Sequence, residues 1–130
     1  MKPVILWGPV VAMMALIFYA SSLSDPGLPR NLSDKAAHFL VYGALGGTLV
    51  RALAGGRSAR MTARCIGAAT AIAILYGVSD EIHQTFVPPR TPDWRDVVAD
   101  AIGALVGAAA VSLAAKVFSR LTRDARSANI

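Results

Sequence analysis

The sequence predicts an all-α integral membrane protein, a four-helix bundle forming one domain over residues 1–130. Hydrophobic residues make up 55% of the chain and charged residues only 16%, whereas ordinary soluble domains carry about 25% charged residues. The apolar residues gather in four runs, each close to the ~20 residues that a helix needs to cross a bilayer. Clusters of turn-forming residues separate these runs. We therefore expect spans at about residues 4–22, 34–53, 63–86 and 96–118.

The first two spans differ in how they begin. The first apolar run is long for a signal peptide and lacks a small-x-small cleavage pattern at its end, so we expect an uncleaved anchor. Ser33 suits the N-cap of the second span, and Asp34 follows it in the first turn, where an acid complements the helix dipole. Gly43 and Gly47 form a small-xxx-small pair, which predicts close approach of another helix.

The last two spans are bounded by helix-breaking residues. Gly55-Gly56 provides the turn before the third span, and Pro88-Pro89 ends that span. Gly103 and Gly107 give the fourth span a second small-xxx-small pair. Two such pairs on different spans predict at least one tight helix–helix contact.

Basic residues set the expected orientation. Nine of the thirteen Lys and Arg residues precede the first span, join the second and third spans, or follow the fourth. The two other connections, with the adjoining helix ends, carry seven of the eight acids. The positive-inside rule therefore predicts cytoplasmic N- and C-termini, with the loops at residues 23–33 and 87–95 facing outward. We expect a multi-pass protein of the bacterial inner (cytoplasmic) membrane.

The net charge of +5 is explained by this orientation. The basic residues lie beside apolar runs and do not alternate with aromatic residues, so we expect the lipid bilayer as a partner and no nucleic acid. Cys65 is the only cysteine, which rules out an intramolecular disulfide.

Polar residues of the last three spans are expected to gather at the outward end. Asp34, His38 and Tyr42 are four residues apart and share one face of the second span. His38 and Asp100 should lie about one turn below the membrane surface. Because ionisable groups facing lipid are costly, we expect these polar faces to point at one another. The third span contributes Tyr76, Asp80, His83 and Gln84, and the fourth contributes Asp93, Asp96 and Asp100.

Three site chemistries fit these residues. Arg90 could grip a phosphate or carboxylate with two hydrogen bonds. A carboxylate and an imidazole on one helix face, as in Asp34 and His38, resemble metal sites of helical bundles, although neither a metal nor a cofactor can be named. An acid that orients a histidine suits acid–base chemistry on a lipid head group. The candidate catalytic residues are Asp34, His38, Asp80, Glu81 and His83, and the candidate ligand-binding residues are Lys35, Tyr42, Gln84, Arg90, Asp96 and Asp100.

Three ordered stretches of this sequence resemble the signatures of the VanZ-like family of small membrane proteins. They extend over about residues 21–107, and the resemblance implies a multi-helix membrane protein. The founding member of that family is linked to low-level resistance to the glycopeptide teicoplanin. Most members have no assigned role, so resistance is not carried over as the task of this protein. The stretches are Ser33–Phe39 with Tyr42-Gly43, Asp80–Phe86 with Pro89-Arg90, and Asp93–Asp96 with Asp100, Gly103 and Gly107.

The resemblance also suggests which residues form the site. Position 100 is often an amide in such proteins, whereas this chain carries an acid there. The motif positions carried over are Asp34, Lys35, His38, Asp80, Glu81, His83, Gln84, Arg90, Asp96 and Asp100.

Our leading hypothesis is a cell-envelope protein whose polar site, at the outer membrane face, engages a lipid-linked or cell-wall-related anionic head group. A link to glycopeptide antibiotic tolerance is an expectation that rests on the family resemblance alone. One alternative is a membrane-embedded acid–base or metal-dependent enzyme, such as a hydrolase or transferase, that acts on a lipid head group. Another is a structural or partner-binding module, in which the opposing charges only hold the helix ends in register.

Overall fold

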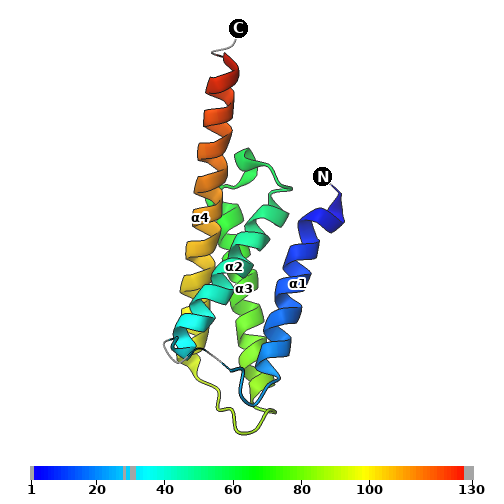
Figure 1. Cartoon of the computed structure of the whole chain (residues 1–130), viewed down its shortest axis with the longest axis vertical. Coiled ribbons are helices and arrows are strands. Elements are labelled where there is room, and N and C mark those ends of the chain that lie inside the picture. Colours follow the sequence, from blue (N-terminus) through cyan, green and yellow to red (C-terminus); the bar gives the residue numbers. More distant parts are fainter. Residues whose placement is uncertain (1, 28, 30–31, 128–130) are drawn as a thin grey trace.

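The computed structural model describes residues 2–27, 29 and 32–127, and they form an all-helical bundle (Figure 1). The four long helices are α1 (Pro3–Ser21), α2 (Asp34–Leu53), α3 (Ala63–Gln84) and α4 (Trp94–Ser127), with a short 3-10 turn, η1, at Ser58–Arg60. Each long helix has the length and the apolar composition required to cross a membrane. The predicted all-α, four-helix fold is confirmed.

Helix ends follow the capping chemistry of the sequence. The Ser33 hydroxyl accepts a hydrogen bond from the backbone N–H of Ala36, as expected for an N-cap. α3 ends at Gln84, earlier than position 86, because the chain tightens into turns before Pro88-Pro89. α4 continues beyond position 118 to Ser127, since Leu121, Ala125 and the arginines of its basic tail are good helix formers and Arg126 lies in the last turn.

α2 and α4 pack more closely than any other pair of helices in the described chain. A Cβ atom added to Gly46 would collide with the backbone of Ala104, and one added to Gly107 would collide with the backbone of Gly43. Gly43 thus lies against both Gly103 and Gly107, so the two small-xxx-small pairs meet. The sequence predicted a close helix approach at these glycines but not that the two pairs would face each other. Close backbone approach gives these helices extensive van der Waals contact, which drives helix association in lipid. It also fixes which polar residues of α2 face α4.

α1 completes the bundle by packing against α2 and α3. The Tyr76 hydroxyl donates a hydrogen bond to the Met14 carbonyl oxygen at 2.6 Å, which ties α3 to α1. The α1–α2 and α3–α4 connections lie at one end of the bundle, and α4 extends past the other helices at the opposite end (Figure 1). The beginning of α1 and the end of α4 share that opposite end. Their cytoplasmic location remains a prediction.

Candidate functional site

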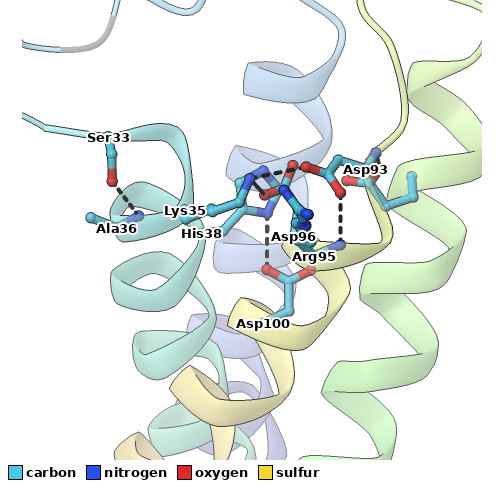
Figure 2. Close-up of polar contacts among 9 residues, drawn as sticks. Ser33, Lys35, Ala36, His38, Asp93, Arg95, Asp96 and Asp100 are labelled. Carbon is cyan, nitrogen blue, oxygen red and sulfur yellow. Dashed lines mark hydrogen bonds and ion pairs between the residues drawn. The ribbon is translucent and has the colours of Figure 1, made fainter.

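A hydrogen bond between His38 and Asp100 connects α2 to α4 near the loop end of the bundle (Figure 2). His38 Nδ1 lies 2.9 Å from Asp100 Oδ1, and the side chains are 10% and 1% exposed. The second carboxylate oxygen, Oδ2, is buried without a hydrogen-bond partner among the described residues. It faces Gly77 of α3, where an added Cβ would lie only 2.6 Å away. Asp100 is thus held between three helices.

This geometry prepares His38 for chemistry at its other ring nitrogen. If Nδ1–H donates to Asp100, Nε2 keeps a free lone pair. A carboxylate on one side of the ring fixes its tautomer and makes the opposite nitrogen more basic. That nitrogen can then accept a proton or ligate a metal ion.

Lys35 forms a second bridge from α2, one turn nearer the helix start. Its Nζ lies 3.0 Å from Asp93 Oδ2 and 3.2 Å from Asp96 Oδ1. Asp93 also accepts a hydrogen bond from the Arg95 backbone N–H at 2.9 Å, which caps α4. That N–H and then the Lys35 ammonium hold the pKa of Asp93 below its usual value. Figure 2 shows Lys35 and His38 both reaching across to the acids that begin α4.

A third polar chain runs along α3 into the loop. Gln84 Nε2 donates to Asp80 Oδ2 at 3.2 Å, and Arg90 Nε donates to Gln84 Oε1 at 3.2 Å. Asp80 and Gln84 are buried. Beside them, Glu81 Oε2 accepts the backbone N–H of Asp93 at 2.9 Å, and its Oε1 is buried without a described partner. Gln84 therefore fixes where the Arg90 guanidinium lies.

Two adjoining cavities open among these residues. The inner cavity measures about 100 Å³ and the outer one about 380 Å³, and both are lined by Pro26, Asp34, Gln84 and Arg90. The Tyr42 hydroxyl is buried without a described partner, although Tyr42 lines the inner cavity. The other residues of the inner wall are Ile17, Ala20, Ser21, Ala37, His38, Val41 and Asp80, and those of the outer wall are Ser24, Asp25, Pro89 and Thr91.

Most of the candidate residues named from the sequence therefore lie together. Six of them line a cavity, and four more support the polar network beside it. The lining residues are Asp34, His38, Tyr42, Asp80, Gln84 and Arg90, and the supporting residues are Lys35, Glu81, Asp96 and Asp100.

His83 is the candidate that the structure does not bring into this group. Its ring stacks on Phe18 of α1 with centroids 4.5 Å apart, and its Nε2 lies 3.0 Å from the Ser22 hydroxyl oxygen. The spacing along α3 put His83 on the same broad face as Asp80, but α1 occupies that side of the helix. His38 therefore contacts Asp100 of α4, whereas His83 contacts α1.

The structure adds α1 to the site, which the sequence did not indicate. Ile17, Ala20 and Ser21 form a wall of the inner cavity, and Pro26 reaches it from the following loop. These residues carry no polar motif, and an apolar run reads the same whether it faces lipid or a cavity. The only sequence feature that pointed to this part of the site is the turn-forming composition of the loop that follows α1.

One subset of the polar residues has the spacing of a candidate metal site. Asp34, His38 and Asp96 each offer a ligand atom, and these atoms lie within 4.8 Å of one another. Oxygen and imidazole donors suit divalent cations.

Comparison with known proteins identifies a family. A family model described as VanZ/LLP1 matches residues 6–115. The comparison with curated proteins and the comparison with solved structures gave no match. The match and the four apolar helices together describe a multi-pass membrane protein in a lipid bilayer.

Proposed function

Since the chain belongs to the VanZ/LLP1 family, we propose that its paired cavities bind the anionic head group of a lipid-linked molecule of the bacterial cell envelope. One observation carries the proposal: Arg90 lines both cavities and is oriented by Gln84. Within the described residues, Arg90 forms no ion pair with a carboxylate.

The position of Arg90 favours an anion as ligand. One guanidinium N–H is used by Gln84, and the terminal N–H groups can form two parallel hydrogen bonds to a phosphate or carboxylate. The outer cavity, of about 380 Å³, is large enough for a small molecule or a head group. Ile17, Ala20 and Val41 make the adjoining inner cavity largely apolar, which suits the first carbons of a lipid tail.

The location of the cavities fits a ligand in the outer leaflet of the inner membrane. They lie at the end of the bundle that carries the two loops with few basic residues. The positive-inside rule predicts that this end faces away from the cytoplasm, so a bound lipid would belong to the outer leaflet.

Binding of a polyprenyl phosphate to the purified protein in nanodiscs tests the proposal. Charge-assisted hydrogen bonds contribute about 1.5–3 kcal/mol, so Arg90→Ala should weaken binding roughly 10- to 100-fold. Arg90→Lys should recover part of this loss, because it keeps the charge without the planar fork. Arg95→Ala is the matched control, since Arg95 lies near the same membrane end but lines neither cavity. Equal binding by the Arg90 and Arg95 variants would refute the assignment.

The His38–Asp100 pair favours a second candidate function, hydrolysis of a phosphate ester in the same site. His38 Nε2 would take a proton from a water molecule as its oxygen bonds to phosphorus, and the ester P–O bond would break. The released alcohol oxygen would then receive the proton. Phosphate release that disappears in His38→Ala and persists in Arg95→Ala would establish this enzyme. Lipid binding without turnover would support the binding function and exclude hydrolysis. A protein that shows neither lipid binding nor turnover would instead be a structural module.

A further inference from the structure

The first observation is a set of three donors from two helices. Asp34 and His38 lie four residues apart on α2, and Asp96 approaches them from the first turn of α4. Their ligand atoms are within 4.8 Å of one another, so small side-chain rotations bring all three onto a single ion. Asp100 engages His38 Nδ1 at 2.9 Å, which leaves Nε2 as the donor. A carboxylate behind a ligating histidine is the usual partner of a metal-bound imidazole.

An independent observation indicates a ligand in the adjoining cavity. Tyr42 is only 1% exposed, and its hydroxyl is buried without a hydrogen-bond partner among the described residues. Tyr42 and the two α2 donors line the same inner cavity. A buried hydroxyl without a partner is costly, and a ligand that enters this cavity and shifts its wall would supply the partner.

Electrostatics gives a third reason. Asp34 and Asp25 line the outer cavity with Arg90, and Asp80 lines the inner one. An anionic head group held by Arg90 would be repelled by these carboxylates. A divalent cation between the acids and the head group turns the repulsion into attraction, as metal ions do at phosphate sites.

We propose that Asp34, His38 and Asp96 bind one first-row divalent cation of the Mn²⁺ or Zn²⁺ type beside the inner cavity, which Asp34 and His38 line. One imidazole and two carboxylates, with no thiolate, match this class of ion. Three protein ligands leave room for water or for a ligand oxygen. The binding of the ion itself is independent of the head-group proposal. Only its contact with a head-group phosphate rests on the proposed function.

A substitution at Lys35 tests this metal site specifically. Its ammonium lies 3.2 Å from Asp96 Oδ1, so it competes with a cation for that carboxylate. Replacing Lys35 with Met should therefore tighten metal binding, whereas a site elsewhere in the protein would not respond. This gain of affinity cannot arise from misfolding.

The experiment is a metal titration of chelator-treated protein in detergent without added lipid. Mn²⁺ binding is followed by electron paramagnetic resonance and Zn²⁺ binding by calorimetry. We expect about one ion per chain, at least tenfold weaker binding in Asp34→Asn and His38→Gln, and tighter binding in Lys35→Met. Asp124→Asn should bind like the unmodified protein, because Asp124 lies near the far end of α4 and lines neither cavity. Thermal unfolding of each variant verifies that it is folded.

The results separate this inference from the head-group proposal. Absence of saturable binding, or equal binding by Asp34→Asn, Asp124→Asn and the unmodified protein, overturns the metal site. Arg90-dependent lipid binding in the presence of chelator would still support the head-group site. Metal binding without any lipid binding would leave the ion site standing alone.

Discussion

Separating His38 from Asp100 should destabilise the protein in a non-additive way. The two side chains are 10% and 1% exposed, and they share a hydrogen bond of 2.9 Å. Removal of one partner from a buried pair costs about 3–5 kcal/mol in soluble proteins, but interhelical polar pairs in a membrane protein couple by ~0.6 kcal/mol on average and ~1.7 at most. Because the pair lies near the end of the bundle between closely packed helices, we expect a coupling energy of about 1–1.5 kcal/mol.

A double-mutant cycle measures this coupling. The unmodified protein, His38→Ala, Asp100→Ala and the double variant are unfolded reversibly in lipid bicelles, and the four free energies of unfolding are compared. Asp100→Asn is the conservative control, because its amide oxygen can still accept the Nδ1–H bond, so it should cost less than Asp100→Ala. Effects that add within about 0.5 kcal/mol would show that the two residues do not stabilise the fold together, and would refute the reasoning.

Three further predictions follow from other parts of the structure. Gly46→Ala should destabilise the bundle by about 1–3 kcal/mol, because its added methyl group would collide with the backbone of Ala104. Gly67→Ala is the control: an added Cβ there meets open space, so the change should be neutral or stabilising. Equal free energies of unfolding for the two variants in bicelles would contradict the close α2–α4 contact. Asp93 has a lowered folded-state pKa, so its stabilisation is present at neutral pH and is lost as the pH falls from its ordinary value of 3.8 through the lower folded value. Asp93→Asn should remove that part of the acid dependence of unfolding. In a cysteine-free background, Thr91→Cys should react with an impermeant thiol reagent added outside intact cells and Ser58→Cys should not; the reverse pattern would invert the predicted orientation.

Much of the fold could be predicted because the membrane restricts the choices. A backbone in lipid must satisfy its own hydrogen bonds, so each apolar run of the right length is a helix. The glycine pairs at Gly43 and Gly107 also carried information about contact, since only small residues permit the backbone approach observed. Helix ends were less accurate, because the basic tail of α4 prolongs the helix through local propensity rather than through apolar content.

The sequence predicted that a polar site would form between the helices, but only some of the residues that line it. The cost of facing lipid predicted that polar helix faces would converge, and His38 and Asp100 do meet although they are 62 residues apart. The periodicity of α3 could not decide between Asp80 and His83 as cavity residues. That choice depends on where α1 packs, which places His83 against Phe18.

The amino-acid sequence alone determined the four helices, their apolar surfaces and the helix faces that carry His38 and most of the acids. These properties follow from local periodicity and from the energetic cost of polar groups in lipid. The tertiary structure alone decided that α1 walls the cavity, that Gln84 orients Arg90, and that Asp34, His38 and Asp96 share one small volume. Distances between helices depend on how their surfaces interlock, and no single stretch of sequence contains that information.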